Sequence, residues 1–472
     1  MVQAGTLDID ALRAGETPSR AHMARTVFSL SVPAILAELS TTLMQYIDAS
    51  MVGSLGAHAT ASVGIVESTI WLLDGLAMSA AVGFTVQVAQ LVGAGRDCDA
   101  RNVLRQSIVV LLAFGALLAA CGHAVAPALP KWMGAEPELY ADASGYFRIC
   151  SLALVPLALS RLGTGMLQCS GDMRTPSMLN VLSCALDVCF NAMLIHEGWV
   201  FSLGPLELQL PGFGLGIRGA ALGTLLAQIV TSALLLWCAL VRSERLSLRE
   251  HGIWLPQRSV LRPAWSLTWP MFLERAVTSA AYVACTAIVA PLGVVAVAAN
   301  SLAITTEAIC YMPGMGIESA ATTLVGQAIG AHRKDIARSF ARLSTILGML
   351  VMSASGLLMF VTAPQVMGML TPDVAVQELG VRVLRIEAFA EPLFAASMVA
   401  AGALRGAGDT LVPSIISLAS MWGVRITLMW FVAPVWGLVG VWAVMAFELC
   451  VRGALFLVRL LRDRWLERAA LA

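Results

Sequence analysis

The sequence predicts an all-α membrane protein of twelve transmembrane helices, arranged as two six-helix lobes that are copies of one unit. Three observations carry this prediction: the composition, the number of long apolar runs and an internal repeat. Hydrophobic residues make up 58% of the chain and charged residues only 13%, with a mean hydropathy of +0.79. Soluble proteins carry about 25% charged residues, so we expect most of this chain to lie in a lipid bilayer.

Long apolar runs follow one another along the whole chain. Each has roughly 20 residues, enough to cross the ~30 Å hydrocarbon core as a helix. They centre near residues 40, 70, 112, 155, 185, 230, 280, 310, 350, 390, 422 and 448. We interpret Gly and Pro inside the runs as kinks or close helix contacts, because irregular backbone cannot face lipid. The first 24 residues are polar, so no secretory signal peptide is expected.

An internal repeat divides the chain into two halves. Residues 29–101 reappear as residues 266–338 at a constant offset of 237, without a gap and with about a quarter of the positions identical. Each copy holds six helices, so the second copy enters the membrane in the same direction as the first. We therefore expect a parallel repeat whose pseudo-two-fold axis runs along the membrane normal.

The basic residues predict boundaries and orientation. Most of the 30 Lys and Arg residues lie at one alternating set of helix ends, which the positive-inside rule assigns to the cytoplasm. Both termini are then cytoplasmic, and the Arg-rich, Lys-poor usage suggests a bacterial inner membrane. The expected order is a tail (1–24), a first lobe (25–242), a cytoplasmic linker (243–263), a second lobe (264–462) and a tail (463–472).

Several protein classes are excluded by what the chain lacks. Its only lysines are Lys131 and Lys334, so it has no GK[ST] phosphate loop. His196-Glu197 has Val200 where a zinc protease needs a second His. The ten cysteines form no CxxC pair. We expect no enzyme, no cofactor and no nucleic-acid partner, and energy for uphill transport would come from an ion gradient.

Carboxylates inside the spans need a reason, because an acid at the centre of a membrane helix costs ~2.5 to 3.5 kcal/mol. An acid required only to build a lobe should occur in both copies. Asp172 and Asp409 do so, each four residues before a proline, Pro176 or Pro413. We interpret these four residues as structural: an acidic cap before a proline that opens the next helix.

Three polar residues of the first copy have apolar or weakly polar counterparts in the second. Asp48 aligns with Cys285, Asp187 with Val424 and Asn191 with Leu428. The fold can therefore be built without strongly polar groups there, so we predict an ion-coupling role for the three. The alternative is that the two acids only hydrogen-bond across helices and hold the lobe together.

Further polar residues extend this candidate site. Asn180 shares one face of the fifth run with Asp187 and Asn191, and Thr224 shares a face of the sixth run with Gln228. Carboxylate, amide and hydroxyl groups suit a proton or a hard cation, so a bound Na⁺ would be held by Asp48, Asp187 and Asn191. We assign Asn180 and Thr224 to the ion-coupling set and Gln228 to a substrate-binding set.

The second copy has acids of its own. Glu274 stands beside Arg275, and Glu448 stands four residues before Arg452. Both are interpreted as internally neutralised pairs. Glu307 has no basic neighbour in the sequence, so it is the better candidate for attracting a cationic substrate, with Glu274 as the second candidate.

Several stretches resemble the multidrug and toxin extrusion (MATE) family, and the resemblance covers about residues 25–462. They are 46–56 (YIDASMVGSLG), 90–95 (QLVGAG), 171–176 (GDMRTP), 216–224 (GIRGAALGT), 325–331 (VGQAIGA) and 404–410 (LRGAGDT). Each alone is a weak signal, whereas their order and spacing together are specific.

The resemblance implies two lobes that work by alternating access and export organic cations in exchange for H⁺ or Na⁺. It also implies that the first-helix acid lies beside the fifth and sixth helices, which maps onto Asp48, Asp187, Asn191 and Thr224. DinF-like members often have Asn before Asp on the fifth helix, whereas Asp187 precedes Asn191 here. NorM-like members have an important acid on the seventh helix, where Glu274 lies.

The predicted function is secondary active multidrug efflux by a monomer in the lipid bilayer, with small cationic or amphiphilic substrates. The alternative is a flippase for lipid-linked saccharides, which would need a strongly basic central cavity. The spans hold few arginines without an acidic neighbour in the sequence, mainly Arg148, Arg161 and Arg425, so this alternative ranks second. A non-transporting scaffold or sensor ranks third.

Overall fold

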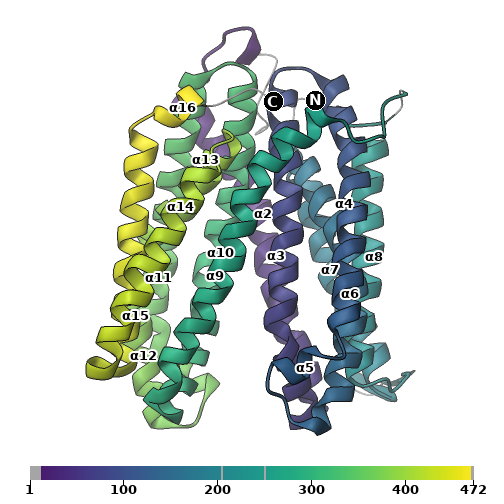
Figure 1. The fold of residues 1–472 in the computed structure, drawn as a ribbon, viewed down its shortest axis with the longest axis vertical. Coiled ribbons are helices and arrows are strands. Elements are labelled where there is room, and N and C mark those ends of the chain that lie inside the picture. Colours follow the sequence, from purple (N-terminus) through teal and green to yellow (C-terminus); the bar gives the residue numbers. More distant parts are fainter. Residues whose placement is uncertain (1–11, 204–205, 249–250, 469–472) are drawn as a thin grey trace. The chain divides into compact units, whose positions relative to one another are not determined.

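The computed structural model describes residues 12–203, 206–248 and 251–468, and most of this chain is helical (Figure 1). In the first half the helices are α2 (Arg20–Gly53), α3 (Ala57–Gly93), α4 (Asp97–Val125), α5 (Leu129–Trp132), η1 (Pro137–Leu139), α6 (Tyr140–Cys169), α7 (Arg174–Ile195), α8 (Ile217–Trp237) and η2 (Cys238–Arg242). In the second half they are α9 (Arg258–Val289), η3 (Ala290–Leu292), α10 (Val294–Gly330), α11 (Lys334–Leu370), α12 (Val374–Ala388), α13 (Glu391–Gly406), α14 (Leu411–Ser420), η4 (Met421–Ile426), α15 (Thr427–Leu461) and α16 (Arg464–Arg468).

Within the described residues, ten helical stretches are long and apolar enough to cross a membrane. One of them, Leu411–Leu461, contains two spans, because Gly437 leaves the helical region with φ 58° and ψ −145°. A further span consists of α12 and α13, which only Phe389 and Ala390 separate. The ten stretches therefore contain eleven spans, α12 with α13 makes the twelfth, and the predicted helix number is confirmed.

A hairpin interrupts the repeat between α7 and α8, where the first copy has the longer loop. Strand β1 (Gly198–Leu203) pairs antiparallel with β2 (Leu206–Pro211). After this insertion the copies align again at a shorter offset. Gly216 before α8 has φ 57° and ψ −131°, nearly the dihedrals of Gly437 before the last span. Both positions need a residue that tolerates positive φ, which is why glycine occupies each.

Contacts group the chain into two compact units. One contains the residues up to Leu39, then Ala89–Arg96 and Trp265–Ala472; the other contains Ser40–Val88 and Asp97–Ala264. The division passes through α2 and α3, so the first part of α2 belongs with the second half of the chain. The expected lobe boundaries at 25–242 and 264–462 stay predictions.

Within the first of these units, the ends of α3 and α10 cross closely. A Cβ on Gly93 would overlap the carbonyl oxygen of Gln327, and a Cβ on Gly330 would overlap that of Gln90. The repeat pairs Gly93 with Gly330 and Gln90 with Gln327, so the crossing is reciprocal. Two copies of one Gln-x-x-Gly sequence thus bring two helix backbones together, which only glycine permits.

Candidate ion-coupling site

A cluster of carboxylates and an amide lies among α2, α7 and α8. Asp187 and Asn191 stand one turn apart on α7, and each side chain is only 1% exposed. Asp48, on α2, is half-buried. Thr224 on α8 places its hydroxyl beside the Asp187 carboxyl. The structure therefore brings together four of the five residues predicted for ion coupling.

The amide of Asn191 bridges the two carboxylates. Its Nδ2 donates to Oδ1 of Asp48 at 2.9 Å and to Oδ2 of Asp187 at 3.2 Å. The two carboxyl groups also lie within hydrogen-bonding reach of each other when one carries a proton. Within the described chain, Oδ1 of Asp187 and Oδ1 of Asn191 accept no hydrogen bond. The site thus has spare acceptor capacity at a buried position, where an unsatisfied polar atom is costly.

This arrangement favours the uptake of one positive charge. Two ionised carboxylates would repel each other in surroundings of low dielectric constant, and the neutral amide does not cancel either charge. A proton shared by the pair, or a small cation held by its oxygens, removes that repulsion. Apolar residues further along the same helices, including Met51, Val52 and Ile195, pack together in the same unit.

Two other residues predicted near this site do not join the bridge. Asn180 is half-buried on α7 and, among the described residues, makes no hydrogen bond to the cluster. Gln228 lies one turn after Thr224 on α8, and its Oε1 is buried without a hydrogen-bond partner in the described chain. Their proposed roles in ion coupling and substrate binding stay predictions.

The turn acids differ between the copies. Oδ1 of Asp172 accepts hydrogen bonds from the backbone N–H groups of Arg174 and Thr175 at 3.1 and 3.0 Å, as a helix cap does. Oδ2 of Asp409 instead accepts from the guanidinium of Arg459, at 2.6 Å from Nη2. Pro176 and Pro413 are each the third residue of the helix that follows, α7 and α14.

A second group of buried acids lies in the other unit. Glu387 and Glu391 are fully buried, and none of their four carboxyl oxygens has a hydrogen-bond partner in the described chain. They flank the break between α12 and α13, and Glu307 on α10, 9% exposed, interacts electrostatically with both. The sequence pattern predicted a role for Glu307 but not for Glu387. The signal available was an i, i+4 pair of acids at the start of an apolar run.

Glu448 and Glu274 of the second copy have partners of different kinds. Glu448 binds Arg452 at 3.2 Å, as the i, i+4 spacing predicts, and also binds Nη2 of Arg425 at 2.7 Å. The expected pairing of Glu274 with Arg275 is wrong in the described structure: Oε2 of Glu274 accepts instead from the Ser414 hydroxyl at 2.7 Å. The Ser414 bond satisfies Glu274 without cancelling its charge.

Two of the three arginines that lack an acidic neighbour in the sequence have one in space. Arg161 donates to both carboxyl oxygens of Asp74, at 3.2 Å from Nε and 2.9 Å from Nη2. Arg425 binds Glu448. Arg148 is exposed on α6. Two of these three arginines are therefore compensated by an acid of another helix or segment.

Comparison with known proteins places this chain in a family. The family model described as MatE matches residues 33–193 and, separately, residues 270–431. The two matches begin at Pro33 and Pro270, which the internal repeat pairs at its offset of 237. The chain therefore belongs to the MatE family and contains two copies of its characteristic unit.

Curated relatives are similar over nearly the whole chain. The probable multidrug resistance protein NorM of Thermotoga maritima is 25% identical over 452 residues, which cover 95% of this chain and 94% of that protein. The protein of the same name from Xanthomonas axonopodis pv. citri is 28% identical over 457 residues, covering 94% and 95%.

Among solved structures, a MOP superfamily transporter from Pyrococcus furiosus has a TM-score of 0.86 at 20% identity, covering 98% of this chain and 99% of that chain. A multidrug resistance MATE family transporter in an outward-facing conformation has a TM-score of 0.85 at 21% identity, covering 96% and 100%. These similarities establish the fold of a multi-pass membrane protein with two six-helix lobes.

Proposed function

We propose that this protein is a secondary active antiporter that exports cationic and amphiphilic drugs in exchange for H⁺ or Na⁺. The observation that carries the proposal is the buried pair of Asp48 and Asp187, bridged by Asn191. Such a pair needs one positive charge to be stable, and it occurs in only one copy of a duplicated fold. The names of the curated relatives support drugs as the substrate class.

Exchange follows if the ion and the drug favour different conformations. An ion that enters from outside neutralises the pair and changes the packing of α2, which carries both Asp48 and Pro33. The conformation with the neutralised pair then binds the drug less tightly, and the drug leaves outward. Release of the ion to the cytoplasm resets the site. Coupling requires only that both ligands bias one equilibrium.

The acids of the second copy are proposed as the attraction for cationic substrates. Glu307, Glu387 and Glu391 concentrate negative charge in one unit. The carboxyl groups of Glu387 and Glu391 accept no hydrogen bond in the described chain. Glu274 and Gln228 are the further substrate contacts we propose. We further propose that the protein is a monomer in the inner membrane. Both of its termini are then cytoplasmic, as the positive-inside rule requires.

The observations favour drug export over flipping of lipid-linked saccharides. A flippase of that kind needs uncompensated basic residues, whereas Arg161 and Arg425 each bind an acid. The Pyrococcus furiosus transporter is described as having a binding pocket of reversed polarity that suggests a different function.

The test is efflux of a fluorescent cationic dye from proteoliposomes, with a pH gradient or a Na⁺ gradient imposed separately. Wild type should export the dye with one of the two gradients and thereby identify the ion. Asp48→Asn should abolish export while the protein keeps its elution profile and melting temperature. If neither gradient moves any of several dyes, drug antiport is wrong and lipid-linked substrates become the next test.

A further inference from the structure

The position that faces Asn191 across the helix interface is a glycine. A Cβ added to Gly223 on α8 would overlap the amide oxygen of Asn191 and would lie 3.0 Å from its backbone nitrogen. Under about 3.0 Å, real Cβ contacts essentially do not occur, so any side chain here displaces Asn191. Asn191 can therefore bridge both carboxylates only because residue 223 has no side chain.

The second copy shows that this glycine is not a requirement of the fold. Matching Gly216 with Gly437, which share their unusual dihedrals, places Gly223 opposite Val444 and Thr224 opposite Met445. The offset of 237 places Asn191 opposite Leu428. Leu428 does not take the buried place of Asn191, because it follows the π-helical turn η4 and is 36% exposed; the glycine position alone is filled in the second copy, by the buried Val444.

We propose that Gly223 is a positioning residue of the ion-coupling site. Its missing side chain lets the Asn191 amide turn its nitrogen toward Asp48 and Asp187, which holds the two carboxyls at the separation where they share one ion. This inference rests on the proposed function. It predicts that Gly223 sets the ion dependence of transport, although it touches neither carboxylate.

The test compares Gly223→Ala with Gly64→Ala, a matched control on α3 whose added Cβ meets no atom within 4 Å. Dye efflux is measured in proteoliposomes across a series of pH values and Na⁺ concentrations. Gly223→Ala should slow efflux about 10-fold, as removal of a residue that orients a ligand typically does, and should change the ion dependence. Gly64→Ala should keep the wild-type profile.

A double variant separates positioning from folding. Gly223→Ala with Asn191→Ala removes the amide that the added Cβ would overlap, so it should recover the melting temperature lost in Gly223→Ala while ion-driven efflux stays lost. If Gly223→Ala lowers only the yield of folded protein and leaves the ion dependence unchanged, the positioning role is wrong. If wild type itself shows no ion-driven efflux, the proposed function fails first.

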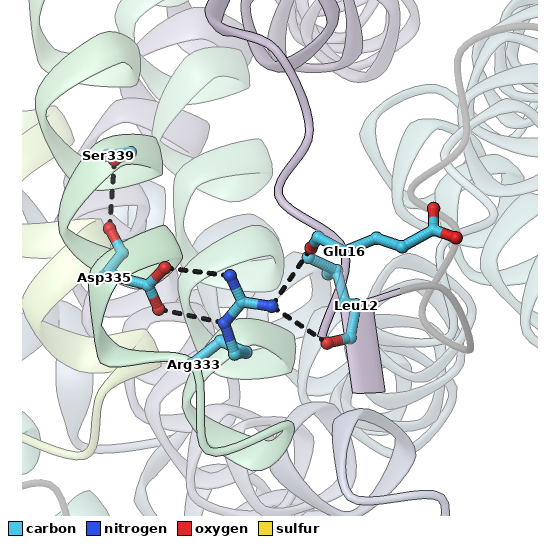
Figure 2. A network of polar contacts seen from close by, with 5 residues as sticks. All are labelled: Leu12, Glu16, Arg333, Asp335 and Ser339. Atoms are coloured by element: carbon cyan, nitrogen blue, oxygen red, sulfur yellow. Dashed lines mark hydrogen bonds and ion pairs between the residues drawn. The ribbon is translucent and has the colours of Figure 1, made fainter. Parts of the chain in front are cut away.

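An independent observation concerns the segment that precedes α2. Nη1 of Arg333, in the turn between α10 and α11, donates to the backbone carbonyl oxygens of Leu12 at 3.2 Å and Glu16 at 3.0 Å (Figure 2). Leu12 is only 1% exposed. Asp335 holds the same guanidinium through two bonds of 3.0 and 2.9 Å, so the donor is fixed before the segment binds.

The segment is also held at the other copy of this turn. The Arg13 guanidinium packs so closely on Gly95 that a Cβ there would overlap it. Gly95 and His332 are equivalent in the repeat, and both have positive φ, 69° and 59°. All these residues belong to one unit. The leading segment thus contacts both copies of one turn. Its own Arg13 packs on Gly95 of the first copy, and Arg333 of the second copy donates to its backbone.

We propose that this segment is a latch that fixes the start of α2. Asp48 lies further along the same helix, so a change at the ion site acts on a helix whose first turn is anchored. Without the anchor, α2 responds to the ion while the drug stays bound, and exchange becomes leaky.

The test uses Arg333→Ala and Leu12→Asp, which remove the donor and the buried side chain respectively. Glu16→Ala is the matched control, because its carbonyl stays and its carboxylate points away from Arg333 (Figure 2). Both latch variants should speed tryptic cleavage after Arg13 and lower the dye exported per ion, whereas the control should match wild type. Unchanged cleavage and stoichiometry in both latch variants would overturn the latch.

Discussion

The two copies of the repeat carry different chemistry at the same sequence positions. On α7 and α8 these positions hold Asp187, Asn191, Gly223 and Thr224, and the equivalent positions on η4 and α15 hold Val424, Leu428, Val444 and Met445. The backbone differs as well, because η4 is a π-helical turn whereas α7 is regular. The packing differs too, because in and after this turn Arg425 and Met429 are buried while Leu428 is 36% exposed.

The acids of the second copy lie elsewhere. Glu448 is enclosed by Arg425 and Arg452, while Glu387 and Glu391 have no hydrogen-bond partner in the described chain. A neutralised acid of this kind supports the fold, and an unpartnered buried acid is a candidate for function. Substitutions can test whether the residues of the two copies divide into those that support the fold and those that serve function.

The largest effect on stability is expected for Glu448→Ala. Removing this carboxylate leaves the buried Arg425, 5% exposed, and the half-buried Arg452 without their shared counter-charge, which costs about 3 to 5 kcal/mol. Thermal unfolding followed by tryptophan fluorescence in detergent should show a large fall in melting temperature. Glu138→Ala, at an exposed acid of η1, is the control, and an equal melting temperature for both variants would remove the structural role of Glu448.

Asp187→Asn should separate function from stability. The amide keeps the shape of the carboxyl and removes the repulsion between Asp187 and Asp48, at a position where the repeat offset places Val424. We expect a melting temperature at or above that of wild type, with ion-driven dye efflux reduced to the level of protein-free liposomes. Wild-type efflux from this variant would show that the carboxylate pair only packs helices.

Local rules predicted much of this molecule from its sequence. Apolar run lengths gave the twelve spans, and the i, i+4 spacing gave the Glu448–Arg452 pair. Contacts between distant helices could not be predicted in this way: Arg161 meets Asp74 across 87 residues of chain. Glu387 was missed because Arg382 and Arg385 precede it, which is typical of a solvated helix, and only the packing around α12 buries it. That Asp48 meets α7 came from the family resemblance and not from periodicity.

The crossing of α3 and α10 offers a test of symmetry between the copies. Gly93→Ala and Gly330→Ala each place a Cβ against a backbone oxygen of the other helix, and forcing such a contact costs about 1 to 3 kcal/mol. Because the contacts are reciprocal, the two variants should lower the melting temperature equally. A large difference between them would mean that the repeat is symmetric in sequence but not in its packing energy.

Glu307→Gln should have the smallest effect of these substitutions, and it tests whether the two copies have different functions. If the second-copy acids attract the drug and the first-copy acids bind the ion, losing this charge should weaken dye affinity about tenfold, or ~1.4 kcal/mol. The ion concentration that half-saturates efflux should stay at the wild-type value. Dye binding by fluorescence anisotropy and efflux in an ion series measure the two quantities separately. A shift in ion dependence with unchanged dye affinity would reverse the assignment, because the ion would then be sensed by acids in both copies.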